Sequence, residues 1–143
     1  MKNIYLFLIG WCLLFTSCER MGYYNDGEMS IITMLCDRIW VSESHDKGYT
    51  YYTCYDFDPD GTYTRLYITI DPEGKESRRQ WKYEWSFGDP AYNTILLSES
   101  PYDYWAIKRL TTEKLEVYER SGQMGEPNYQ SKYLEFEAYE ELP

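Results

Sequence analysis

Apolar and polar residues alternate with a period of two along most of the chain after residue 38. Short segments rich in aromatic and β-branched residues are separated by Gly, Pro, Asp and Asn at roughly ten-residue spacing, which is typical of all-β proteins. The pattern predicts eight strands, at residues 39–45, 49–58, 62–71, 75–87, 92–99, 102–110, 114–121 and 128–138. No crossover helix is predicted between them, so neighbouring strands are expected to pair antiparallel.

A short helix is predicted just before the first strand. Ser30 is a residue type that caps helix N-termini, and the apolar residues that follow it are Ile31, Ile32, Met34 and Leu35. Eight sequential antiparallel strands commonly close into a barrel, because closure removes exposed sheet edges. We therefore predict an all-β fold, an eight-stranded antiparallel up-and-down barrel with a short N-terminal helix, over residues 28–138. A two-sheet sandwich is the alternative.

Two turns of the same type set the register of the middle strands. The segments 58–62 and 71–75 read Asp-Pro-Asp-Gly-Thr and Asp-Pro-Glu-Gly-Lys, which predicts a type I turn followed by a Gly bulge. A third tight connection, after Leu110, is expected to place Arg109 opposite Glu116. Closing the first two turns places six aromatic side chains on one inward face: Tyr55, Phe57, Tyr63, Trp81, Tyr83 and Trp85.

This register creates a conflict. It directs the charged side chains of Arg65 and Arg79 inward, and it directs the apolar side chains of Leu66, Ile68 and Ile70 outward. A bulge in the third or fourth strand would reverse these faces. Without a bulge, each guanidinium must meet a buried carboxylate, Tyr hydroxyls or an anionic ligand head group, because an unpaired buried charge is very costly. The sequence leaves both alternatives open.

The N-terminus has the pattern of an export signal. Lys2 precedes an apolar run over residues 4–15, too short to span a bilayer but suited to a signal peptide. The following Thr16-Ser17-Cys18 resembles the lipobox of bacterial lipoproteins, although Phe15 stands where Leu is usual. The resemblance implies a signal peptide at 1–17, lipidation of Cys18, a tether at 18–27 and a place in the cell envelope, anchored to the outer membrane on either its periplasmic or its surface side.

Charge narrows the possible partners. The chain has 14 Lys and Arg against 24 Asp and Glu, a formal net charge of −10. Nucleic-acid binding needs a basic surface and is not expected. An acidic domain is also repelled by anionic lipid, so we expect it to be held at the membrane by its acyl anchor alone. The acidic tail, residues 139–143, is expected to end loosely.

Two cysteines remain beyond the signal and the lipidated residue. An exported protein meets an oxidising environment, so Cys36 and Cys54 are candidates for a disulfide. The alternative is a pair of buried free thiols, because spacing does not establish the geometry that a disulfide needs.

The candidates for catalysis and metal binding are weak. His45 is the single histidine, and its neighbours Ser44 and Asp46 lie too close in sequence to form a triad. Residues 56–61 match the opening of a calcium loop, but the position of the bidentate Glu is taken by Tyr67. We therefore predict no enzyme activity, no catalytic residue, no metal and no cofactor.

Several pieces, in this order, resemble the small lipocalin-like lipoproteins of Bacteroidetes-type bacteria. They are Trp40 in the first strand, the hairpin at 57–63, the segment 81–83 in the fourth strand, and 104–107 leading to Leu110 and Leu115. Classical lipocalins have Gly two residues before the first Trp, where this chain has Arg38. The resemblance implies a barrel with one end open toward a cavity, and it implies no particular ligand.

Two functions follow as hypotheses. In the first, the barrel binds a small apolar or amphipathic ligand against its aromatic interior. The candidate ligand-binding residues are Tyr55, Phe57, Tyr63, Arg65, Trp81, Tyr83, Trp85 and Trp105. In the second, the barrel has a solid core and is a structural or protein-interaction module, with an outward patch of Leu66, Ile68 and Ile70 for a protein partner of unknown identity.

Overall fold

The computed structural model describes residues 31–100, 103–122 and 130–143. The predicted signal peptide, the tether, Cys18 and Ser30 lie outside these residues. The elements, in chain order, are α2 (Ile31–Cys36), β1 (Ile39–Asp46), β2 (Tyr49–Phe57), β3 (Thr62–Ile70), β4 (Glu76–Phe87), β5 (Thr94–Leu97), β6 (Asp103–Leu110), β7 (Lys114–Ser121) and β8 (Gln130–Tyr139).

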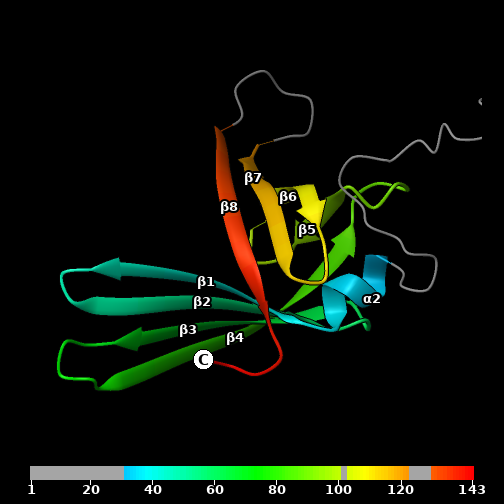
Figure 1. The fold of residues 1–143 in the computed structure, drawn as a ribbon. Helices are drawn as coiled ribbons and strands as arrows, with labels where there is room; N and C mark the ends of the chain where they lie inside the picture. Colours follow the sequence, from blue (N-terminus) through cyan, green and yellow to red (C-terminus); the bar gives the residue numbers. More distant parts are fainter. Residues whose placement is uncertain (1–30, 101–102, 123–129) are drawn as a thin grey trace, which may run out of the picture.

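The eight strands form a closed antiparallel barrel in which each strand pairs with its sequence neighbours and β1 pairs with β8 (Figure 1). This confirms the predicted fold class and the short helix, and it rules out the two-sheet sandwich. The predicted strands agree with the observed ones to within two residues at either end. The closure is physically favourable because it pairs backbone groups that an open sheet would leave at its edges.

The two Pro-containing turns set the register as expected. The Asp58 amide donates to the Thr62 carbonyl at 2.8 Å and the Asp71 amide donates to the Lys75 carbonyl at 3.0 Å. Gly61 and Gly74 have φ of 89° and 83°, a left-handed conformation that favours glycine. Each turn therefore needs its glycine.

The pairing of β3 with β4 runs without interruption from Thr62 opposite Glu84 to Ile70 opposite Glu76. The bulge that was one of the two alternatives is therefore not formed in these strands. The barrel has its register shift elsewhere, between Ile107 and Arg109 of β6. Arg109 lies opposite Glu116 as predicted, but the ion pair with Glu116 comes from Lys108, at 3.5 Å.

The barrel is closed over only part of its length. β1 pairs with β8 through Ile39–Val41 alone, and β4 pairs with β5 through Trp85–Phe87 alone. Beyond these contacts the two hairpins β1–β2 and β3–β4 continue as a four-stranded sheet that projects from the barrel (Figure 1). We call this projection, residues 42–53 and 65–83, the wing.

The interior of the barrel is filled by side chains. Its largest fully buried members are Trp40 and Trp105, and they pack with the aromatic and aliphatic residues Tyr55, Phe57, Tyr63, Trp85, Ile95, Leu97, Leu110, Leu115, Val117 and Phe136. Helix α2 covers the end opposite the wing, where the Trp40 indole nitrogen donates to the Leu35 carbonyl at 2.8 Å. Burial of this many large rings accounts for most of the hydrophobic stabilisation.

A second apolar cluster lies on the outer face of the wing and its base. Val41, Cys54, Leu66 and Ile68 are buried there, and Tyr139 packs against them. The C-terminal residues continue over this face, because Arg78 of β4 donates to the Pro143 carbonyl at 3.3 Å. The acidic tail, which was expected to end loosely, contacts this face through Tyr139 and Pro143, while Glu140, Glu141 and Leu142 are exposed.

Candidate functional site

Five of the eight predicted ligand-binding residues belong to the packed interior. Tyr55, Phe57, Tyr63, Trp85 and Trp105 are each at most 8% exposed. Their rings pack against one another at close range, with 4.7 Å between the centroids of Tyr55 and Trp105 and 5.6 Å between those of Phe57 and Trp85. The Trp85 indole also donates to the Asp58 carbonyl at 2.9 Å. These contacts make the five residues parts of the core.

The other three predicted residues, Arg65, Trp81 and Tyr83, lie on the inner face of the wing or at its base. Trp81 is 41% exposed, and its ring meets the half-buried Tyr67 edge-on at 5.7 Å. Tyr83 is also half-buried and contacts the core residue Tyr63, with 5.5 Å between ring centroids. The aromatic face is therefore continuous from the barrel core onto the wing.

Arg65 is held by a carboxylate of the chain itself. It forms an ion pair with Glu99, which lies in the connection between β5 and β6, and the two side chains are 26% and 16% exposed. The guanidinium carbon also lies 4.6 Å from the Tyr67 ring centroid and 5.5 Å from that of Tyr55. Burial alone would lower the pKa of Arg65, but Tyr55 and Glu99 outweigh it and raise the pKa.

The structure confirms the alternative without a bulge, and the buried carboxylate that this alternative requires is found for Arg65 only. Arg65 points inward without any bulge and meets a buried carboxylate, while Arg79 on the same face is exposed. Leu66 and Ile68 are buried, as the bulged alternative required, but on the outer face. The conflict disappears because both faces of the sheet are covered near the base of the wing.

Two polar atoms at the base of the wing are buried without a hydrogen-bond partner among the described residues. They are the hydroxyl of Tyr63 and the Nε atom of Arg65. Burial raises the pKa of Tyr63, and the nearby charge of Glu99 raises it further. A buried hydroxyl without a hydrogen-bond partner costs free energy.

The inner face of the wing carries further aromatic rings. The register places Tyr49 and Tyr51 on the same face as Tyr67 and Trp81, and both tyrosines are exposed. Their rings stack with 6.0 Å between centroids. The predicted ligand-binding residues did not include Tyr49, Tyr51, Tyr67 or Arg79. The alternation from Tyr49 to Tyr55, together with the two turns, was the signal that could have found the aromatic members.

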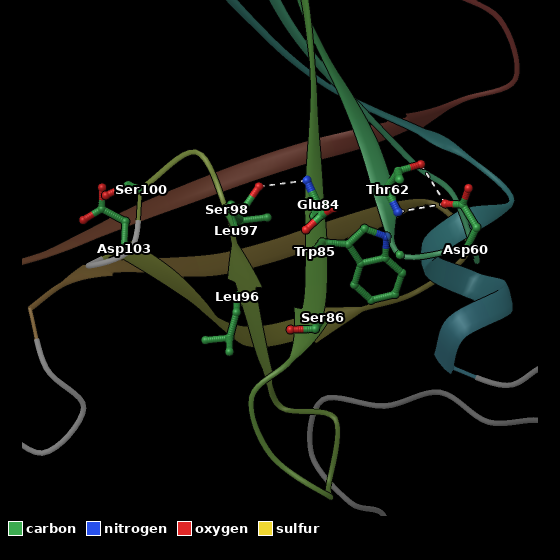
Figure 2. Close-up of a pocket in the computed structure, with 11 residues that line it drawn as sticks. Asp60, Thr62, Glu84, Trp85, Ser86, Leu96, Leu97, Ser98, Ser100 and Asp103 are labelled. Atoms are coloured by element: carbon green, nitrogen blue, oxygen red, sulfur yellow. Dashed lines mark hydrogen bonds between the residues drawn. The ribbon is translucent and has the colours of Figure 1, made fainter.

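A pocket of about 550 Å³ lies beside the junction of β4 and β5. Figure 2 shows hydroxyl and carboxyl groups around it, with the apolar side chains of Leu96, Leu97 and Trp85 in its wall. The polar lining residues are Asp60, Thr62, Glu84, Ser86, Ser98, Ser100 and Asp103, and none of the described lining residues is Lys or Arg.

Several of the pocket's polar groups already have partners within the chain. The amide and hydroxyl of Thr62 donate to Asp60 at 2.8 and 2.7 Å, and these hydrogen bonds lower the pKa of Asp60. The Glu84 amide donates to the Ser98 hydroxyl at 2.8 Å. The pocket was not predicted, because its lining residues come from four separate segments.

Cys36 and Cys54 are free thiols. Cys36 packs against the barrel core beside α2, whereas Cys54 belongs to the outer cluster, so the proposed disulfide is not formed. Burial raises the pKa of Cys36 to about 12 and that of Cys54 to about 11. Both thiols are therefore protonated and unreactive near neutral pH.

Within residues 31–100, 103–122 and 130–143, no group of three or more His, Cys, Asp or Glu is placed to hold a metal ion. In the same residues, no helix has the length and apolar character needed to cross a bilayer. No protein family, curated protein or solved structure matches the chain.

Proposed function

We propose that this protein is a lipoprotein of the bacterial cell envelope, held at the outer membrane by lipid on Cys18. The apolar run at residues 4–15 and the Thr16-Ser17-Cys18 sequence support this proposal. In this proposal an acyl chain on Cys18 tethers the barrel to the membrane surface. The role that we propose for the barrel is binding, because its aromatic side chains form a continuous face that reaches the surface.

The proposed activity is the binding of a small ligand on the aromatic face of the wing. The observation that carries this proposal is the continuity of that face, from buried Tyr63 through half-buried Tyr83 and Tyr67 to exposed Trp81. A ligand bound there contacts rings that the fold has already ordered. Ordered rings lose little entropy on binding, which favours affinity.

Packing argues against a ligand inside the barrel. A ligand there would have to displace rings such as Trp105, and emptying a core site of this size costs about 3–5 kcal/mol. The solid core agrees with the alternative, a structural or interaction module. The outer patch that this alternative needs is largely covered, however, because Leu66 and Ile68 are buried in the outer cluster.

The anchor is tested by Cys18→Ala. The variant is expected in the soluble fraction or as an uncleaved precursor, whereas wild-type protein partitions with membranes. Retention of a processed Cys18→Ala protein in the membrane would show that lipid on Cys18 is not the tether.

Ligand binding is tested by native mass spectrometry of protein purified from membranes, before and after extraction with organic solvent. We expect a bound mass that extraction removes and that Trp81→Ala protein carries in reduced amount. A bound mass that Trp81→Ala retains in full would contradict a site on the wing.

A further inference from the structure

We propose that the inner face of the wing binds an uncharged oligosaccharide, and this inference rests on the ligand-binding role proposed above. The observation behind it is the composition of that face. It contains aromatic rings, small hydroxyl groups and three charged side chains, and it contains no aliphatic side chain. Its members, read from the register, are Ser42, Ser44, Asp46, Tyr49, Tyr51, Thr53, Arg65, Tyr67, Thr69, Ser77, Arg79, Trp81 and Tyr83.

The outer face of the same strands differs, because it combines an aliphatic cluster at its base with charged side chains such as Glu43, Glu76 and Arg78. There Val41, Leu66 and Ile68 form an aliphatic cluster, which the chain covers with Tyr139 and its C-terminal residues. An aliphatic surface suits a lipid tail or another apolar protein surface. Rings flanked by hydroxyl groups suit a ligand with flat C–H faces and hydroxyls at its edges, which is the chemistry of a sugar ring.

The exposed rings form a line across the wing. Tyr51 of β2 lies diagonal to Tyr67 of β3, which lies diagonal to Trp81 of β4. Diagonal neighbours in adjacent strands are about 7–8 Å apart, so the line from Tyr51 to Trp81 is about 15 Å long. This length suits a chain of several sugar rings. Hydroxyl groups of Thr53 and Thr69 lie beside the line as hydrogen-bond partners.

The charge of the face also suits an uncharged ligand. The charge of Arg65 is met by Glu99, which leaves Asp46 and Arg79 with one charge of each sign. Arg79 is exposed and takes part in none of the ion pairs found among the described residues. The face is therefore neutral on a chain with a formal net charge of −10. A polyanion or a strongly basic partner therefore gains little electrostatic attraction from this face.

The test uses the full-length protein with cellohexaose, xylohexaose and mannohexaose as probes, and follows intrinsic tryptophan fluorescence and calorimetry. Trp81 is the exposed tryptophan of the described residues, so ligand contact is expected to shift the emission. We expect at least one hexasaccharide to bind, and Trp81→Ala and Tyr51→Ala each to weaken it about tenfold, the loss of one ring contact. Tyr133→Ala is the matched control, because Tyr133 is 42% exposed but lies on the outer face of β8.

A parallel titration with sodium dodecanoate separates the two proposals. Dodecanoate binding that depends on Trp81, with no binding of any hexasaccharide, would overturn the carbohydrate inference and leave the ligand-binding role standing. Absence of binding by both probe classes would count against both proposals. Equal weakening by Tyr133→Ala would also overturn the inference, because that side chain lies off the face. Circular dichroism and urea unfolding of each variant identify any loss due to misfolding.

Discussion

The closed barrel and the wing share four strands, yet they treat aromatic side chains in opposite ways. Trp105 in the barrel is 0% exposed, while Trp81 in the wing is 41% exposed, and Tyr55 at 3% contrasts with Tyr51 at 37% in the same strand. The difference arises because strands β5–β8 lie across from β1–β4 in the barrel but not in the wing. β5–β8 cover the inner face of the barrel, but β1 and β4 leave their barrel partners after three residue pairs each. The aromatic rings of this face are therefore exposed where they lie beyond the closed part of the barrel.

The two faces of the wing differ in a related way. The outer face is aliphatic at its base and covered by the chain's own C-terminal residues, whereas the inner face is aromatic and uncovered. Large exposed aromatic patches commonly mark binding surfaces. Buried side chains are therefore concentrated in the barrel and the outer cluster, whereas the inner face of the wing keeps several aromatic rings exposed.

The largest expected effect tests this division directly. Trp105→Ala is expected to lower the free energy of unfolding by about 3–5 kcal/mol, because it empties a fully buried site. Trp81→Ala is expected to change it by no more than about 0.5 kcal/mol, as for most surface substitutions. Urea unfolding measures both. Similar losses for the two variants would show that the wing is as much a part of the core as the barrel interior.

The second prediction concerns the outer cluster. Ile68 is 1% exposed although it faces away from the barrel interior, so Ile68→Ala is expected to cost about 2–4 kcal/mol. Gln80→Ala, at an exposed position on the same face of β4, serves as the control and is expected to be neutral within about 0.5 kcal/mol. A neutral Ile68→Ala would mean that the C-terminal residues do not keep water from this face.

A smaller loss of stability is expected from breaking the ion pair between Arg65, at the base of the wing, and Glu99. Glu99→Gln removes the charge that faces Arg65 and is expected to cost about 2 kcal/mol, because a half-buried guanidinium loses its carboxylate. The exposed turn residue Glu113 provides the control variant Glu113→Gln. Thermal unfolding at neutral pH measures the difference, and equal melting temperatures for the two variants would argue against the ion pair.

The smallest effect is a chemical one and leaves the fold intact. Burial favours the neutral thiol, so alkylation of Cys36 and Cys54 by iodoacetamide is expected to be slow at pH 8. Labelling should accelerate as the pH rises toward the pKa of about 11 at Cys54, and later at Cys36, whose pKa is about 12. Peptide mass spectrometry reads each site separately. A peptide pair joined by a disulfide would instead show that the two thiols come together.

Much of the fold could be predicted because its signals are local. Gly61 and Gly74 each permit a turn that few other residues tolerate, and each turn fixes the register of the strands on either side. Strict alternation then identifies which side chains share a face, since the pleat repeats every two residues. For the same reason Tyr55, Phe57, Tyr63 and Trp85 could be assigned to the interior from sequence.

The candidate site was only partly predictable. Register placed Trp81 and Tyr83 on the face of the core residues, but it did not show that Trp81 lies beyond the closed part of the barrel. Glu99, which lies 34 residues from Arg65 in sequence, was not predicted as its partner. The pocket beside β4 and β5 was missed for a similar reason, because its walls are remote in sequence.

The sequence by itself determined the strands, the turns, the register and the sharing of faces, because these depend on backbone conformation within a few residues. Only the tertiary structure decided which stretches of each face are covered. Leu66 and Ile68 are buried because residues near the C-terminus reach them, and Trp81 is exposed because β5 pairs with β4 only as far as Trp85. Cys36 and Cys54 remain free because they belong to separate clusters. Whether a face is covered depends on contacts between segments that are distant in sequence. Neither the alternation of apolar residues nor the spacing of turns predicts those contacts.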